Sequence, residues 1–451
     1  MRILLEIFLF AGIFFPIYHM CNVLFSLKKS NKKEINEDRF ISILIPCYNE
    51  EKIIKNTIEG LIRIDYMNYE CLFINDGSTD KTLKELKEVL QLRKVNRIKR
   101  YDLCSKAIKE IYQSERYPNM FVIDKENGGK SEALNSGINY SLYDYIVTLD
   151  ADSILKKDAI SIMSGVFNDS KVVAASGIIQ IMQSFNLSKD IDRTTLKINN
   201  LLKLQTIEYI KSCYCYKASL AKLKSLLVIS GAFGFFKKDI LLAVDGFSNV
   251  IGEDLDITLK IQFFIKNSNQ KIAYVPEAIC YTEGPETFKD YVKQRKRWQQ
   301  SFIHGLISFR KTIFKATFTE ALPFFMIVDA LFLGIISSFV ILFSSVLIIT
   351  NTINGTLWHI LIYLYIFVLI HLIYNIIGLC IACYYGIKFK GMDIIRLIFT
   401  VILDIFIYRM IILYTIISGT ISYFSNKRDW NKVNRSGYDY DVLKKGNEEY
   451  E

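Results

Sequence analysis

Long apolar stretches lie near both ends of the chain, and shorter apolar runs fill the region between them. Residues 3–26 are apolar apart from Glu6 and a few other polar positions, and four lysines follow between residues 28 and 33. About 20 apolar helical residues cross a bilayer, and cytosolic flanks carry an excess of Lys and Arg. The pattern predicts a transmembrane helix at residues 1–27 that leads into the cytosol. A cleaved signal peptide is the alternative, but the run is long for one and no A-x-A-like site follows it.

The last third of the chain contains three more apolar stretches. Residues 322–350 and 357–383 are each long enough to cross a bilayer. Residues 394–424 are also apolar but include three charged side chains, so either one tilted span or an interfacial helix followed by a span fits them. The expected order is interfacial helices at 286–321, about three transmembrane helices at 322–425 and a polar tail at 426–451.

Between the membrane segments, short apolar runs alternate with stretches of helical periodicity. Four runs of strand length are residues 41–46, 69–75, 119–124 and 143–150. The segment after each run has the apolar spacing of an amphipathic helix. This alternation predicts a doubly wound α/β domain at residues 28–285, in which ligands bind at the carboxyl ends of the strands.

Composition narrows the class of protein. Apolar residues make up 51% of the 451 residues, and the mean hydropathy of +0.22 argues against a purely cytosolic globule. The net charge of +10 suits either nucleic acid or anionic lipid, and the apolar runs favour the membrane. We expect no nucleic-acid partner, and we interpret the basic stretch 91–118 as a surface insertion. The nine cysteines have no zinc-ribbon spacing and indicate a reducing compartment.

Polar residues follow each of the four predicted strands. They are Asn49 and Glu50, then Asn75-Asp76-Gly77-Ser78, then Asn127-Gly128-Gly129-Lys130, and finally Asp150-Ala151-Asp152. Carboxylates at one sheet edge can hold a ribose, a base edge and a divalent cation. The Gly-Gly-Lys turn can direct backbone N–H groups and one ammonium towards a diphosphate. The predicted ligand is a nucleotide diphosphate with Mg²⁺ or Mn²⁺.

Seven motifs in order carry a resemblance to a known family. They are PCYNEE (46–51), NDGSTD (75–80), VIDKENGGKSEALNSGI (122–138), TLDADS (148–153), SGAFGFF (230–236), GEDLDI (252–257) and QRKRW (294–298). In this combination the chain resembles the membrane-integrated family 2 glycosyltransferases, and among them the bacterial poly-N-acetylglucosamine and cellulose synthases. QRKRW is similar to the Q-x-x-R-W element of processive members. The resemblance implies a GT-A fold with transmembrane helices, in a multi-pass protein of a bacterial inner membrane whose catalytic domain is cytoplasmic.

The resemblance also implies a role for each matching residue. It makes Asp254 the catalytic base, with Glu253 orienting the site, and it makes Asp150 and Asp152 the metal ligands. Inverting transfer needs such a carboxylate to deprotonate the acceptor hydroxyl, while the metal stabilises the departing diphosphate. The implied donor-binding residues are Pro46, Asn49, Glu50, Asn75, Asp76, Lys130, Asp150, Gln294 and Arg297.

Within that set, the resemblance directs Asp76 to the uracil ring and Lys130 to the diphosphate. Many relatives carry two aspartates where this chain has Asn75-Asp76, and an asparagine can still hydrogen-bond a base. The expected acceptor contacts are Gly231, Phe233 and Trp298. The alternative for residues 230–236 is an ordinary buried strand, and for Trp298 it is a membrane anchor.

Three functions remain open from the sequence. The first is a processive synthase that extends a β-linked polysaccharide from a UDP-sugar and passes it through its own membrane channel, with UDP-N-acetylglucosamine favoured and UDP-glucose next. The second is a non-processive enzyme that adds one sugar to a membrane lipid, and the third is an inactive nucleotide-binding regulatory subunit. The expected partners are the donor, a growing polysaccharide or lipid acceptor, membrane lipids, and an accessory synthase or export subunit.

Overall fold

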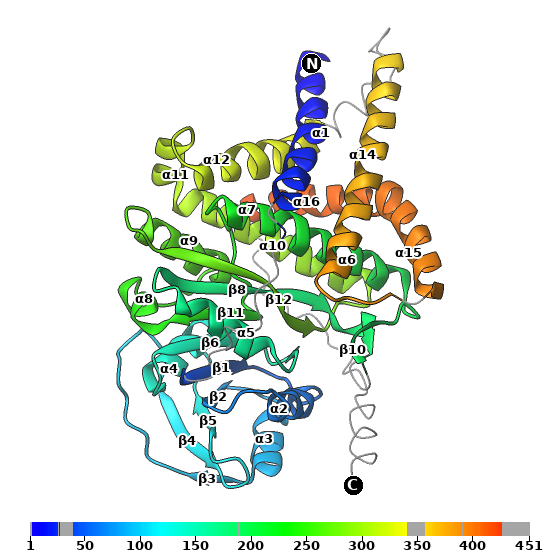
Figure 1. The fold of residues 1–451 in the computed structure, drawn as a ribbon. Coiled ribbons are helices and arrows are strands. Elements are labelled where there is room, and N and C mark those ends of the chain that lie inside the picture. Colours follow the sequence, from blue (N-terminus) through cyan, green and yellow to red (C-terminus); the bar gives the residue numbers. More distant parts are fainter. Residues whose placement is uncertain are drawn as a thin grey trace. The chain divides into compact units, whose positions relative to one another are not determined.

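The computed structural model describes residues 2–25, 27, 39–186, 190–340, 357–389 and 391–425. The chain forms two compact units, which are described separately (Figure 1). The helical unit comprises Met1–Lys28, Asp192–Leu227 and Pro285–Asn434, and the α/β unit comprises Lys29–Ile191, Val228–Gly284 and Arg435–Glu451. The predicted tail at 426–451, the end of the predicted span 322–350 and the lysines at 28–33 lie outside the described residues.

The α/β unit is built on a ten-stranded sheet with the order β3-β4-β5-β2-β1-β6-β11-β8-β12-β7. Its strands are β1 (Ile41–Cys47), β2 (Tyr69–Asp76), β3 (Leu92–Lys94), β4 (Ile108–Ser114), β5 (Met120–Lys125), β6 (Tyr145–Leu149), β7 (Ser153–Leu155), β8 (Val172–Ile181), β11 (Phe233–Lys237) and β12 (Lys271–Thr282). A separate two-stranded sheet pairs β9 (Phe185–Asn186) with β10 (Asp190–Thr194). The helices of the α/β unit are α2 (Ile54–Ile62), α3 (Thr82–Leu90), α4 (Lys130–Tyr140), α5 (Ala159–Gly165), α8 (Lys238–Ala243) and α9 (Glu253–Ile265), with short 3₁₀ turns η2 (Val166–Asn168) and η3 (Met182–Ser184).

The four strands predicted from the sequence form the parallel centre of this sheet. Strands β5, β2, β1 and β6 are neighbours and run parallel, so their carboxyl ends lie at one edge. They are almost continuously buried, as expected for parallel strands covered on both faces. Helix α4 packs closely on them, since a Cβ at Gly137 would lie 2.9 Å from a Leu44 methyl group. The predicted α/β fold is confirmed, and that ligands bind at this edge stays a prediction.

The rest of the sheet is mixed, which the sequence pattern did not reveal. Strand β11 runs antiparallel to both β6 and β8, and β4 runs antiparallel to β5. The short strands β3 and β4 come from the basic stretch 91–118, which therefore extends one edge of the sheet. Its charged residues alternate with half-buried ones, so the apolar signal is too weak to predict strands.

A buried ion pair ties this basic stretch to the sheet centre. The Arg97 guanidinium contacts Glu70 on β2, and both side chains are at least 92% buried. The other Glu70 oxygen accepts hydrogen bonds from Ser42 Oγ at 2.6 Å and from the Leu142 backbone N–H at 2.7 Å. Arg97 Nε also donates to the Tyr140 carbonyl at 2.7 Å. Buried charges need such partners, because an unpaired one loses its hydration without compensation.

The helical unit contains three described helices that are long and apolar enough to cross a membrane. They are Ala321–Val340, Tyr365–Tyr384 and Gly391–Phe424. The helices of this unit are α1 (Arg2–Leu24), α6 (Asn200–Lys211), η4 (Ser212–Lys217), α7 (Ala218–Lys222), α10 (Phe288–Ser308), α11 (Arg310–Ala316), α12 (Ala321–Phe324), η5 (Phe325–Ile336), α14 (Leu357–Tyr384), α15 (Gly391–Leu403), η6 (Asp404–Tyr408) and α16 (Arg409–Phe424). Helix α1 covers most of the transmembrane segment predicted at residues 1–27, and its crossing of a membrane stays a prediction. Residues 192–227 group with this unit although the sequence placed them inside the α/β domain.

The last apolar stretch consists of two segments. Residues 391–424 are helical throughout, but 34 residues rise about 51 Å, well beyond a hydrocarbon core of about 30 Å. The π-helical turn η6 separates α15 from α16, and the two helices run in different directions (Figure 1). At this turn the buried Asp404 carboxylate accepts hydrogen bonds from Lys211 at 2.5 Å and Asn375 at 3.2 Å. Asp404 therefore faces the interior of the helical unit.

The Glu70–Arg97 pair gives a stability prediction. The substitution Arg97→Met should lower the free energy of unfolding by about 3–5 kcal/mol, because Glu70 would remain buried without its cation. Arg93→Met is the matched control, since Arg93 is exposed on β3. This substitution should change the free energy of unfolding by less than about 0.5 kcal/mol. The denaturant dependence of thiol labelling at Cys71, which is fully buried on β2, would report this unfolding. Equal midpoints for the two variants would contradict the prediction.

Candidate active site

The loops after β1 and β2 are hydrogen-bonded to each other. Asn49 Oδ1 accepts a hydrogen bond from the Thr79 backbone N–H at 2.7 Å, and the Glu50 backbone N–H donates to Thr82 Oγ1 at 2.7 Å. Asn49 has a φ of +57°, a left-handed conformation that asparagine tolerates better than most residues. Two of the predicted donor-binding residues thus lie in a loop that is held by the NDGSTD motif and by the first residue of α3.

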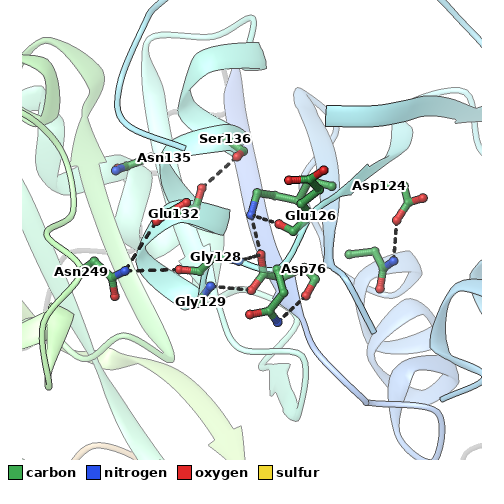
Figure 2. Close-up of polar contacts among 12 residues, drawn as sticks. Asp76, Asp124, Glu126, Gly128, Gly129, Glu132, Asn135, Ser136 and Asn249 are labelled. Carbon is green, nitrogen blue, oxygen red and sulfur yellow. Dashed lines mark hydrogen bonds and ion pairs between the residues drawn. The ribbon is translucent and has the colours of Figure 1, made fainter. Parts of the chain in front are cut away.

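The carboxylate of Asp76, at the end of β2, organises the turn that follows β5 (Figure 2). Its Oδ1 accepts hydrogen bonds from Lys125 Nζ at 2.5 Å and from the Gly128 N–H at 3.0 Å, and its Oδ2 accepts one from the Gly129 N–H at 2.8 Å. Gly129 has a φ of +88°, a backbone conformation that favours glycine. Asp76 is therefore nearly buried and already engaged by three donors.

The ammonium group of Lys130 lies between two carboxylates from different segments. Its Nζ is 2.6 Å from Asp150 Oδ1 and 3.1 Å from Glu253 Oε1. Lys130 is the first residue of α4, Asp150 follows β6, and Glu253 begins α9. Burial lowers the pKa of Lys130, but the Asp150 and Glu253 carboxylates outweigh it and hold that pKa well above its ordinary value. The Lys130 side chain therefore carries a permanent positive charge at the carboxyl ends of the strands.

Gly231 borders this charge cluster. A Cβ at this position would lie 3.0 Å from Lys130 Nζ, 3.5 Å from Asp254 Cβ and 3.6 Å from Glu253 Oε1. Asp254 lies in the first turn of α9, where its Oδ1 accepts a hydrogen bond from the Leu255 N–H at 2.8 Å. The absence of a side chain at Gly231 leaves space beside the ammonium and both acidic residues.

Asp152 lies two residues beyond Asp150, next to strand β7. Its Oδ1 accepts hydrogen bonds from Ser153 Oγ at 3.1 Å and Thr282 Oγ1 at 3.2 Å. Among the described residues, no cluster of three or more His, Cys, Asp or Glu side chains could hold a metal ion. Two carboxylates nevertheless suit Mg²⁺, which commonly takes one or two protein carboxylates and completes its shell with substrate phosphates and water.

Three other predicted site residues belong to the sheet itself. Pro46 pairs with Ile74 within the parallel centre, and Asn75 donates from Nδ2 to Asp124 Oδ1 at 2.7 Å. Phe233, predicted as an acceptor contact, is fully buried on β11. A Cβ at Gly177 would meet its ring at 2.4 Å, so the ring packs directly against the neighbouring strand. Phe233 is therefore a core residue, which corrects the prediction that it contacts the acceptor, whereas Gly231 of the same motif borders the charge cluster.

The Q-x-x-R-W residues lie on α10 in the helical unit. Gln294 is buried, whereas Arg297 and Trp298 are exposed. Between them, Arg295 contacts Glu208 of α6 at 2.6 Å, and its guanidinium carbon is 4.3 Å from the centroid of the Trp298 ring. Glu208 also accepts a hydrogen bond from the Tyr408 hydroxyl of η6. These contacts fix the orientation of α10 against α6.

Comparison with known proteins assigns the family. Residues 42–103 match the model of glycosyl transferase family 2, and residues 102–301 match that of glycosyltransferase like family 2. The chain belongs to glycosyltransferase family 2. The matched residues run from strand β1 to the end of the Q-x-x-R-W segment. This family 2 glycosyltransferase is a hexosyltransferase.

The curated relatives of this glycosyltransferase include polysaccharide synthases. It is 28% identical over 327 residues to a poly-β-1,6-N-acetyl-D-glucosamine synthase of Staphylococcus aureus, covering 72% of this chain and 69% of that protein. The corresponding synthase of Staphylococcus epidermidis is 30% identical over 272 residues, 60% of this chain and 56% of that protein. A mannosyltransferase from Pyrobaculum calidifontis, solved with GDP-mannose and Mn²⁺, has a TM-score of 0.54 at 16% identity and covers 94% of this chain and 99% of its own. That likeness concerns the fold and agrees with the predicted GT-A class.

Sequence reasoning missed two residues that organise the predicted sites. Lys125 is fully buried beneath the Gly128–Gly129 turn, although a lysine at a strand end usually points to solvent. Arg295 lies inside the recognised QRKRW motif but was assigned no role. Only the pairing of Arg295 with Glu208, 87 residues earlier in the chain, reveals its contribution.

The close approach at Gly231 gives a prediction for the rate of sugar transfer. Gly231→Ala should lower the rate several-fold, because the flexible Lys130 ammonium must shift slightly to accept the Cβ. Gly231→Val should lower it about 10²-fold, since a misplacement of about 1 Å at a reacting centre has that effect. Gly12→Ala, at a glycine with no described neighbour within 4 Å, is the control and should retain the full rate. A fully active Gly231→Val variant would exclude Gly231 from the site.

Proposed function

We propose that this family 2 glycosyltransferase is an inverting polysaccharide synthase that transfers N-acetylglucosamine from UDP-N-acetylglucosamine to a growing β-linked chain. The proposal rests above all on the cluster in which Lys130 lies between Asp150 and Glu253, with Gly231 and Asp254 beside it. The identities of the staphylococcal relatives, both named poly-β-1,6-N-acetyl-D-glucosamine synthases, support the sugar and the polymeric product.

On the donor side, the proposed ligand is the diphosphate. The N–H groups at the start of α4 and the Lys130 ammonium provide a positive site for it, because helix N-termini attract anions. Asp150 and Asp152 would hold Mg²⁺ or Mn²⁺, which neutralises charge on the leaving diphosphate when bound. Asp76 retains capacity for the proposed base contact, since a carboxylate has about four acceptor sites and three donors already engage it.

On the acceptor side, we assign the base to Asp254 rather than to its neighbour. Glu253 is held as a counter-ion of Lys130 at 3.1 Å, which keeps its oxygen engaged with the donor side of the cluster. Asp254 takes the proton of the acceptor hydroxyl while that oxygen forms a bond to C1 of the sugar. The bond from C1 to the diphosphate oxygen breaks at the same time, so an α-linked donor gives a β-linked product.

The helical unit provides the proposed acceptor and membrane functions. Trp298 is 41% exposed on α10, and an exposed indole offers an apolar face on which a sugar ring can stack. The three apolar helices would hold the enzyme in a membrane with its catalytic unit on the cytoplasmic side and allow the polymer to cross. An enzyme that adds one sugar to a lipid is the second candidate, because apolar helices also suit a lipid acceptor.

A product analysis would test the proposed function. The full chain in sealed lipid vesicles should convert UDP-N-acetylglucosamine, but not UDP-glucose, into a high-molecular-weight polymer when Mg²⁺ or Mn²⁺ is present. Chelation with EDTA should abolish turnover, because without the metal the acidic residues of the cluster outweigh the single Lys130 ammonium and repel the diphosphate. A singly glycosylated lipid as the sole product would establish the second candidate. Undiminished turnover in EDTA would refute the metal assignment.

The assignment of the base gives a separate prediction. Asp254→Asn should lower the transfer rate by about 10²–10⁴-fold while UDP binding is retained, because the amide fills the same space but takes no proton. Asp256→Asn is the matched control on the same helix, where Asp256 is paired with Lys260 at 3.6 Å, and it should keep most of the activity. A parallel loss of UDP affinity in Asp254→Asn would instead make Asp254 a donor contact.

A further inference from the structure

Lys125 at the end of β5 is a charged side chain with no exposure to solvent. It is the register partner of Asp76 on the adjacent parallel strand, and the two side chains meet at 2.5 Å. Its ammonium also donates to the Glu126 carbonyl at 2.7 Å. Burying an ion pair is costly, and replacing one with apolar groups is often neutral or stabilising. Stability alone therefore gives a weak reason for a lysine at this position.

The contacts of this pair converge on the turn between β5 and α4. Asp76 accepts hydrogen bonds from the Gly128 and Gly129 N–H groups, and the Asn127 side chain donates to the Asp76 carbonyl at 2.8 Å (Figure 2). The next residue is Lys130, the first residue of α4. The pair is thus connected to the Lys130 ammonium through a turn of three residues.

We infer that Lys125 is a positioning residue, whose buried ion pair with Asp76 holds the Gly128–Gly129 turn in the conformation that binds the diphosphate of the nucleotide-sugar donor. This inference rests on the proposed function, because it concerns the same diphosphate site. Without the ammonium, the Asp76 carboxylate loses its charged partner. It is then no longer held in the orientation in which it accepts hydrogen bonds from the Gly128 and Gly129 N–H groups. The turn then relaxes, and Lys130 starts its helix from a different position.

Comparison of a nucleoside with its diphosphate separates this role from a purely structural one. Lys125→Met removes the cation but keeps an unbranched side chain of similar length. In the full chain, titration calorimetry should show UDP bound about tenfold more weakly, the loss expected for one charge-assisted hydrogen bond. Uridine should lose clearly less affinity, because the Asp76 carboxylate proposed to contact the base is still present. Lys55→Met, which removes a largely exposed lysine paired with Glu85 at 2.7 Å, is the matched control and should change neither affinity.

A second variant disturbs the same turn without touching the buried pair. Gly129→Ala forces an alanine into a φ of +88°, yet the nearest described atom to its Cβ would be Asn249 Oδ1 at 3.9 Å. It should weaken UDP binding more than uridine binding. The double variant should lose less UDP affinity than the product of the two single effects, because both act through one turn. Gly129→Ala therefore tests the role of the turn even if Lys125→Met fails to fold.

Each outcome decides one question. Equal weakening of uridine and UDP in Lys125→Met, or unchanged UDP binding in a folded variant, would overturn the inference. Fully multiplicative losses in the double variant would also overturn it, because they would mean that the two sites act separately. A chain that binds neither UDP nor uridine would refute the proposed donor rather than the positioning role. The same comparison would then be made with GDP and guanosine, where a selective loss of the diphosphate would still support the role of Lys125.

Discussion

The candidate active site depends on the ammonium group of Lys130 and its two carboxylate partners. Asp150 follows the fourth parallel strand of the sheet and Glu253 begins α9, so this charge joins segments that are more than 100 residues apart in the chain. Burial disfavours the ammonium, and the carboxylates restore it. The fold therefore keeps Lys130 charged, because it brings Asp150 and Glu253 next to the ammonium. The ammonium in turn allows the two carboxylates to lie close together without repelling each other.

The charge balance of this cluster explains why a divalent cation fits the proposed chemistry. Asp150, Asp152, Glu253 and Asp254 supply four carboxylates, against one ammonium from Lys130, so the cluster has a charge of −3 when all are ionised. A nucleotide diphosphate adds further negative charge and would be repelled by such a site. The N-terminus of α4 offsets about half an elementary charge. In the proposed site, a divalent cation held by Asp150 and Asp152 would lower this repulsion and allow the diphosphate to bind beside the acidic residues.

The helical unit is organised by a segment that interrupts the α/β fold in sequence. Residues 192–227 leave the α/β unit, form α6, η4 and α7, and return to it before β11. Glu208 on this segment binds Arg295 of α10 and Tyr408 of η6, so one carboxylate links three helices. Arg295 in turn lies against the Trp298 ring. The orientation of the Q-x-x-R-W helix is thus set by a segment that contains none of the seven motifs from which the family resemblance was drawn.

These contacts also define what the sequence could predict. The parallel strands were predictable because each is a buried apolar run that ends in polar residues, and that order alone brings Lys130 and Asp150 to one edge. Strands β3 and β4 were not predictable, because their charged residues leave too few apolar positions to mark a strand. The burial of Lys125 was not predictable either. The local sequence does not show whether its side chain faces water or Asp76, because that partner lies 49 residues away in the chain. The same holds for Glu208 and Arg295. The spacing of apolar residues indicates which face of one helix or strand is buried. A buried ion pair joins two such elements, so its role is visible only once their arrangement in the fold is known.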